Sequence, residues 1–99
     1  MKYLLQGSLV AKTGEREALL QIMNRASALM LAKATGCELY VVGHSEGDDN
    51  TVYITEIWAT KEDHEASLAV EGVRELISEA MPILAEMPTK GREIDLVNI

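Results

Sequence analysis

Four segments of the chain show the short, apolar-rich pattern that is typical of β-strands. They cover residues 2–11, 37–45, 51–58 and 92–98. Within them, apolar residues recur at every second position, which turns one side of an extended chain toward a core. Residues 46–50 form a dense cluster of turn formers between the second and third segments. These two strands are therefore predicted to form an antiparallel hairpin.

A first helix is predicted from Glu15 to about Ala34, where apolar residues follow the spacing of one helical face. Acidic residues lie in its first turn and Lys33 lies in its last, which suits the helix dipole at both ends. Gly36 follows as a C-terminal stop. The predicted apolar stripe consists of Leu19, Ile22, Met23, Ala26, Leu29 and Met30.

A second helix is predicted to begin after Thr60, which opens a capping-box pattern with a hydroxyl free to bond backbone N–H groups. It should reach about Val70, and Gly72 should bend or restart it. An apolar stripe then continues to Leu84. Pro82 lacks a backbone donor, so a kink is expected near the end of this helix.

The predicted order of elements is strand, helix, strand, strand, helix, strand, within one domain over residues 1–99. The central hairpin excludes a doubly wound parallel sheet. Right-handed crossovers then give a ferredoxin-like βαββαβ arrangement of the α+β class, a four-stranded antiparallel sheet with two helices on one face. The other sheet face is rich in apolar residues and stays uncovered. We therefore expect a homodimer in which two sheets pack face to face.

Charge, hydropathy and cysteine count argue against several classes of partner and location. The net charge of −7, with no basic stripe, argues against nucleic-acid binding. No apolar run is long enough to span a membrane, and the N-terminal residues turn polar too early for a signal peptide. The single Cys37 cannot form an internal disulfide. These features favour a cytoplasmic location and no membrane association.

The chain lacks most catalytic signatures. It has no glycine-rich phosphate loop, no nucleophile elbow and no zinc-protease motif. His44 and His64 are the only histidines, and neither has a second soft ligand at helical spacing, so no metal site is expected. If the protein is an enzyme, most of the chemistry must come from the substrate rather than from a cofactor.

A family resemblance appears in an ordered set of short motifs. These are Gly36-Cys37 followed by Tyr40, an acidic hairpin, a strand ending in Glu56-Ile57-Trp58, and an acid-rich helix start. The set resembles the antibiotic biosynthesis monooxygenase family over nearly the whole chain. The resemblance implies a dimeric α+β barrel. It also implies cofactor-free oxidation of a quinol or polyphenolic aromatic substrate with O₂, although the family includes haem-degrading members and proteins of unknown role.

The sequence departs from the family pattern on the second helix. Many members carry a histidine nine residues after the tryptophan, where this chain has Ser67. A histidine occurs instead at His64, about one helical turn earlier and on roughly the same face. Haem-degrading relatives place an asparagine on the first strand, where this chain offers Gln6 and Ser8. Both departures argue against a haem function.

Three residues are candidates for catalysis, and each has a structural alternative. Trp58 could stack on a flat substrate, or it could be a core residue between sheet and helix. Glu56, flanked by apolar residues on one strand face, could be a base with a raised pKa. A structural ion pair with an arginine or lysine, from a helix or across the dimer, is the favoured alternative for Glu56. His64 could face the sheet and accept a phenolic proton, or it could be an exposed helix residue.

Other candidates would bind the substrate. Tyr40 and Ser67 could join Trp58 in lining a pocket for a small aromatic or hydrophobic molecule. Met23 is one of several methionines at helical spacing that are either core residues or adaptable pocket walls. His44, near the hairpin, is expected to be solvated.

Two functions remain open. The first is a cofactor-independent monooxygenase, favoured by Glu56, Trp58 and the nearby His64. The second is a non-catalytic dimeric barrel that binds a small hydrophobic ligand or has a structural or stress-related role, favoured by the serine at position 67. The enzyme is the favoured hypothesis, because Glu56 and Trp58 match the family pattern and His64 lies one helical turn from the family position.

Overall fold

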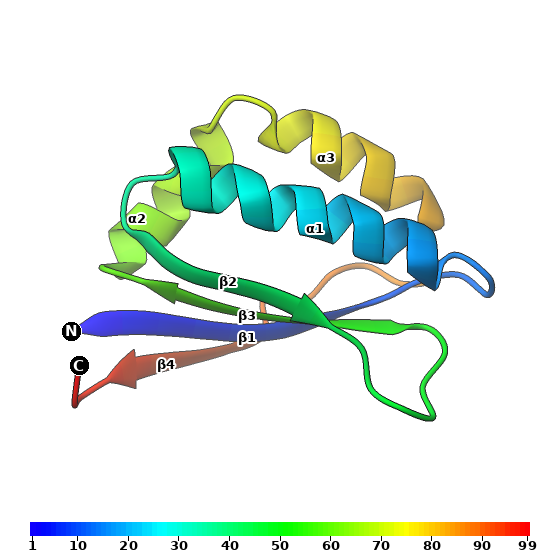
Figure 1. Ribbon diagram of the computed structural model, residues 1–99, viewed down its shortest axis with the longest axis horizontal. Coiled ribbons are helices and arrows are strands. Elements are labelled where there is room, and N and C mark those ends of the chain that lie inside the picture. Colours follow the sequence, from blue (N-terminus) through cyan, green and yellow to red (C-terminus); the bar gives the residue numbers. More distant parts are fainter.

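The computed structural model describes residues 1–99 and has the predicted order of elements. Strand β1 is followed by one long helix, a hairpin, a broken helical segment and a last strand (Figure 1). The bounds are β1 Lys2–Val10, α1 Arg16–Lys33, β2 Cys37–Gly43, β3 Thr51–Trp58, α2 Lys61–Ala66, α3 Val73–Ala80 and β4 Arg92–Leu96, with 3₁₀ turns η1 at Ser67–Ala69 and η2 at Met81–Ile83.

The four strands form one antiparallel sheet in the order β2-β3-β1-β4. All helices lie on one face of this sheet, and the other face is uncovered (Figure 1). This arrangement confirms the ferredoxin-like α+β fold. The predicted strand over residues 51–58 agrees with β3 at both ends.

The second helical segment differs from the predicted single helix. Its start is as expected, because the Thr60 hydroxyl accepts a hydrogen bond of 3.1 Å from the Asp63 N–H. However, α2 ends after Ala66, and Gly72 then adopts a left-handed φ of 98° immediately before α3. Pro82 lies in η2 and not in a kinked helix, because α3 has already ended before the residue that lacks a donor. The structure therefore has three α-helices where the sequence predicted two.

The other predicted boundaries were slightly too long. The second strand ends at Gly43 rather than at position 45, because the hairpin turn starts earlier. In that turn the Asp48 carboxylate accepts hydrogen bonds from the backbone N–H groups of Asn50 and Thr51. The last strand ends at Leu96 rather than at position 98, where its pairing with Lys2 of β1 ends.

The space between sheet and helices holds two hydrophobic clusters. The larger, which we call the leucine cluster, consists of Ala11, Leu19, Ile22, Val52, Ile54, Leu76, Ala80 and Leu84. The smaller, which we call the tryptophan cluster, consists of Tyr3, Leu5, Met30, Trp58 and Val73. The two clusters lie toward opposite ends of β1 and β3, since Trp58 pairs with Tyr3 and Val52 pairs with Leu9. The long helix α1 contributes to both.

The uncovered sheet face carries a continuous apolar row. Leu39 on β2 pairs with Ile57 on β3, which pairs with Leu4 on β1, which pairs with Ile94 on β4. This row crosses all four strands at one level.

None of the helices combines the length and the apolar composition that a membrane crossing requires.

Candidate active site

A cavity of about 350 Å³ lies between the sheet and the helices and extends from one hydrophobic cluster to the other. Such a volume suits a small ligand. Twelve of its sixteen lining residues are hydrophobic. The lining consists of Leu9, Ile22, Met23, Ala26, Met30, Tyr40, Glu56, His64, Ser67, Leu68, Val73, Leu76, Ile77, Ala80, Met81 and Pro88.

Glu56 brings a carboxylate into this apolar wall. It lies in β3 on the helix-covered face, paired with Leu5 on one side and Tyr40 on the other. Its Oε1 accepts a hydrogen bond of 3.0 Å from Trp58 Nε1, which fixes the carboxylate along the strand. Burial raises the pKa of Glu56, and the hydrogen bond from Trp58 partly opposes this rise.

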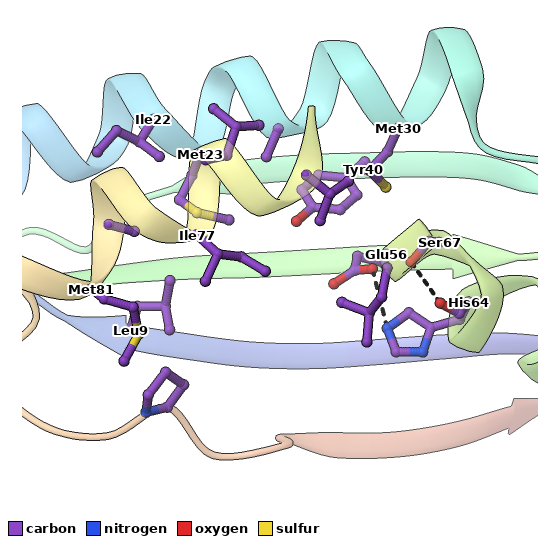
Figure 2. Close-up of a pocket in the computed structure, with 16 residues that line it drawn as sticks. Leu9, Ile22, Met23, Met30, Tyr40, Glu56, His64, Ser67, Ile77 and Met81 are labelled. Carbon is purple, nitrogen blue, oxygen red and sulfur yellow. Dashed lines mark hydrogen bonds and ion pairs between the residues drawn. The ribbon is translucent and has the colours of Figure 1, made fainter. Parts of the chain in front are cut away.

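His64 faces Glu56 from α2 (Figure 2). The His64 Nε2 lies 3.9 Å from Glu56 Oε1, and only 24% of the histidine side chain is exposed. Its ring is also close to two aromatic rings, with centroids 5.5 Å from that of Tyr3 and 5.5 Å from that of Trp58. The imidazole is therefore held between the sheet and the cavity, and the exposed-helix alternative is wrong.

Burial shifts the pKa values of this pair in opposite directions, down for His64 and up for Glu56. Burial lowers the pKa of His64, and the nearby positive charge of Lys90 lowers it further. The opposing acids Glu65 and Glu93 raise the pKa of His64 by less. Glu56 is near enough for an ion pair, yet its own pKa is raised by the same burial. A neutral imidazole beside a partly buried carboxyl can accept one proton from a bound ligand.

A glycine sets the position of α2. Gly36, with φ of 80°, lies directly against Asp63, the residue before His64. A side chain at this position would overlap the Asp63 carboxylate. The Gly36 carbonyl also accepts a hydrogen bond of 2.8 Å from the Ala59 N–H at the end of β3. The junction of α1 and β2 therefore holds the start of α2 closely.

The structure brings Ser67 and Tyr40 to the same cavity. Ser67 is buried, and its hydroxyl donates a hydrogen bond of 2.6 Å to the backbone carbonyl of His64. This leaves the Ser67 oxygen as an acceptor for a ligand. Tyr40 lines the cavity from β2, and burial, with a smaller contribution from Glu56, raises the pKa of its phenol. Tyr40 is therefore a neutral donor.

Methionines form much of the apolar wall. Met23 and Met30 line the cavity from α1, and Met81 lines it from η2. Of these only Met30 is buried, as part of the tryptophan cluster. Flexible thioether side chains can adapt to an aromatic or aliphatic ligand.

Two expectations need correction. Trp58 does not line the cavity, because its side chain is 0% exposed and lies within the tryptophan cluster. Trp58 is therefore a core residue, which is the structural alternative given above. From the core it contacts Glu56 and His64. The expected ion pair of Glu56 with an arginine or lysine from a helix is absent, since its partners are Trp58 and His64, and a partner across the dimer stays a prediction. His44 is exposed near the hairpin, as expected.

Sequence reasoning missed a polar network behind His64. The Tyr3 hydroxyl donates a hydrogen bond of 2.9 Å to Glu93 on β4. The same carboxylate lies 2.8 Å from the Lys90 ammonium and 3.5 Å from that of Lys61. Alternation could have placed Tyr3 on the core face, where a phenol needs a partner. Nothing in the sequence indicates that this partner is Glu93, ninety residues later.

No three histidine, cysteine, aspartate or glutamate side chains converge to form a site for a metal ion. The polar groups of the cavity wall are instead one carboxyl, one imidazole, one phenol and one hydroxyl. This set can bind and exchange protons with a hydroxylated ligand.

The comparisons with known proteins agree on one family. The family model described as antibiotic biosynthesis monooxygenase matches residues 3–79. A solved structure from Chloroflexus aurantiacus J-10-fl, named as a candidate antibiotic biosynthesis monooxygenase, is 31% identical and has a TM-score of 0.84. The match covers 99% of this chain and 95% of that one. No curated protein sequence gives a significant match.

More distant structures share the fold. A candidate antibiotic biosynthesis monooxygenase from Nitrosomonas europaea has a TM-score of 0.89 at 15% identity, covering 98% of this chain and 91% of that one. Another from Caulobacter crescentus CB15 has a TM-score of 0.88 at 14% identity, with the same two coverages of 98% and 91%. At such identities the likeness concerns the fold alone.

Proposed function

Because the chain belongs to the antibiotic biosynthesis monooxygenase family, we propose that it is a cofactor-independent monooxygenase. Its substrate would be a quinol or another polyphenolic aromatic molecule, oxidised with O₂. The observation that carries this proposal is the pairing of His64 with Glu56 in the wall of an otherwise apolar cavity. A proton acceptor in a water-poor site is what such a reaction requires of the protein.

The reaction balances without a further reductant. His64 takes a hydroxyl proton, and the resulting electron-rich phenolate supplies electrons to O₂. One oxygen atom forms a bond to a ring carbon, the O–O bond breaks, and the second oxygen leaves as water. A hydroquinone that enters with an unsubstituted ring carbon thus leaves as a hydroxylated quinone. Glu56 stabilises the imidazolium that forms on His64.

Three side chains would place the substrate. Tyr40 would donate a hydrogen bond to a substrate oxygen, and Ser67 Oγ would accept one from a substrate hydroxyl. Met23 would pack against the ring or its substituents. Trp58 would act on the substrate only through the carboxylate that it holds.

The decisive test is O₂ uptake by purified protein with hydroquinone and anthrone substrates. Uptake should be one O₂ per substrate, without release of hydrogen peroxide. The change His64→Gln should lower the rate about a hundredfold or more, because it removes the proton acceptor. The matched variant His44→Gln alters the exposed histidine and should keep the rate.

The alternative is a non-catalytic barrel that binds a hydrophobic ligand. The observation that favours it is Ser67 at the position where relatives of this family carry a histidine. It would be correct if ligands bind but no substrate gives uptake above the uncatalysed rate. Equal rates for wild type and His64→Gln would also exclude the proposed proton transfer.

The active form would be a homodimer built through the uncovered sheet face. The row formed by Leu39, Ile57, Leu4 and Ile94 crosses the whole sheet, and Val41 and Tyr53 add exposed apolar surface beside it. A second copy presents the same row and can cover it by two-fold symmetry.

Sedimentation at micromolar concentration tests the dimer. The wild type should sediment as a dimer, and Leu39→Lys should shift it toward monomer, because a charge would be buried in the interface. Leu39 is 37% exposed on an edge strand, so this variant should keep its circular dichroism spectrum. A wild-type protein that sediments as a monomer would contradict the proposal.

A further inference from the structure

The polar and apolar lining residues of the cavity are separated along its length. Glu56, His64, Ser67 and Tyr40 lie toward one end, beside the tryptophan cluster (Figure 2). The opposite end is lined by Leu9, Ile22, Met23, Ile77 and Met81, without a polar side chain among them (Figure 2). The cavity is therefore amphiphilic from end to end.

The strand register gives this separation a length. Glu56 pairs with Leu5, whereas Leu9 lies four positions further along β1. Four residues of strand span about 13 Å. On the helix side, Met30 and Met23 are seven residues apart on α1, which corresponds to about 10 Å. A single aromatic ring at the Glu56 end leaves the far end unfilled.

The far end reaches the surface, as the cavity wall also does at Leu68, which follows Ser67 and is 63% exposed. Ile77 and Met81 line the cavity and are 45% and 40% exposed. Pro88, in the segment before β4, is another exposed residue that lines the cavity. An apolar substituent could extend along this end and still bury much of its surface against these side chains.

We propose that the ligand of this cavity is an elongated amphiphile, a hydroxylated ring that carries an aliphatic chain, with the ring at His64 and Glu56 and the chain along Leu9, Ile77 and Met81. Only the hydroxylated ring in this proposal rests on the proposed function. The aliphatic chain is inferred from the apolar half of the cavity, because a polar substituent there would find no side chain to form a hydrogen bond with.

The test measures binding separately from oxidation. Calorimetry with 4-ethylphenol, 4-butylphenol and 4-hexylphenol follows chain length without quinol chemistry. Affinity should rise about fourfold per added methylene that is buried, as expected for burial of apolar surface. In 4-hexylanisole the hydroxyl proton is replaced by a methyl group, and affinity should fall about tenfold because the polar end loses its donor.

A matched pair of variants locates the chain. Ile77→Asn should flatten the dependence on chain length, because it puts an amide beside the chain. Leu31→Asn is the control, since Leu31 is 50% exposed on α1, similar to the 45% of Ile77, and does not line the cavity. It should keep the wild-type dependence. Circular dichroism and urea unfolding should show both variants folded.

Each outcome bears on one proposal. An affinity that does not change with chain length, or the same dependence in Ile77→Asn and wild type, overturns the chain inference, as does a failure of all three phenols to bind. Oxygen uptake with 2-hexylhydroquinone then tests the enzyme separately. Chain-dependent binding without uptake leaves the chain inference intact and removes the monooxygenase. Uptake with no chain dependence does the reverse.

Discussion

The leucine cluster and the tryptophan cluster share one sheet and one long helix, yet their contents differ. The leucine cluster contains only aliphatic residues, and its members pack between β3, α1 and α3. The tryptophan cluster instead contains two aromatic residues, Tyr3 and Trp58, and each donates a hydrogen bond to a carboxylate. His64 lies against these two rings.

This difference separates stability from chemistry within one small core. Aliphatic packing can be optimised without regard to charge, whereas a buried carboxyl needs fixed partners. The cavity extends from one cluster to the other, so a ligand would contact both. Substitutions in the leucine cluster should therefore affect folding first, and substitutions in the tryptophan cluster should affect titration as well.

The largest effect is expected for Leu19→Ala. Leu19 is fully buried in the leucine cluster, and its truncation should lower the free energy of unfolding by about 3 kcal/mol. Urea unfolding measures this loss. The matched variant Leu31→Ala, at an exposed position of the same helix, should change stability by less than about 0.5 kcal/mol. Equal losses for the two variants would contradict the assignment of the core.

A smaller effect with a distinct signature is expected for Trp58→Phe. It should cost about 2 kcal/mol, since the buried Glu56 carboxylate loses its donor. It should also raise the pKa of Glu56 further, because the hydrogen bond from Trp58 is what lowers it. Carbon-13 NMR of the glutamate carboxyls measures the shift. If stability falls but the pKa of Glu56 does not move, the hydrogen bond has no electrostatic role.

The smallest effect is the dependence of stability on pH. Burial lowers the pKa of His64 in the folded protein from 6.5, so the unfolded chain binds its proton first as pH falls. The wild type should therefore lose stability below pH 6.5 relative to His64→Gln, and the loss is complete below the folded pKa.

The same measurement tests the surroundings of His64. The charged and titratable groups around it are Glu56, Lys61, Glu65, Lys90, Glu93 and Tyr3. Burial raises the pKa of Glu56, so its contribution has the opposite sign and stabilises the fold as pH falls. Urea unfolding of wild type and His64→Gln between pH 7.5 and about 5 separates the two. A wild type that gains stability relative to His64→Gln below pH 6.5 would show that His64 is not shielded.

Local sequence patterns predicted most of the fold. Period-two alternation located β3 to the residue, and the Thr60 cap located the start of α2. The end of α2 was harder, because Gly72 is compatible with either a bend or a restart. Its left-handed φ decides for a restart. That choice depends on how α3 packs against α1, and sequence periodicity does not report it.

The candidate site was predicted in part. Alternation placed Glu56 and Trp58 on one strand face, and their separation of two residues made the hydrogen bond possible. Whether Trp58 faces a ligand or the core depends on the depth of the cavity, which is set by α1 and the turn after α2. The contact between Tyr3 and Glu93 depends on β1 and β4 being neighbours, so it follows from topology and not from any local motif.

The fit between Gly36 and Asp63 has a consequence for how this domain can change. Gly36 does not line the cavity. Yet any larger residue there must displace the Asp63 side chain, next to His64, and adopt a left-handed φ that favours glycine. A substitution at position 36 would thus disturb the surroundings of His64 without changing any residue that lines the cavity. When relatives of this chain are compared for activity, the residue at this junction should be checked alongside the cavity itself.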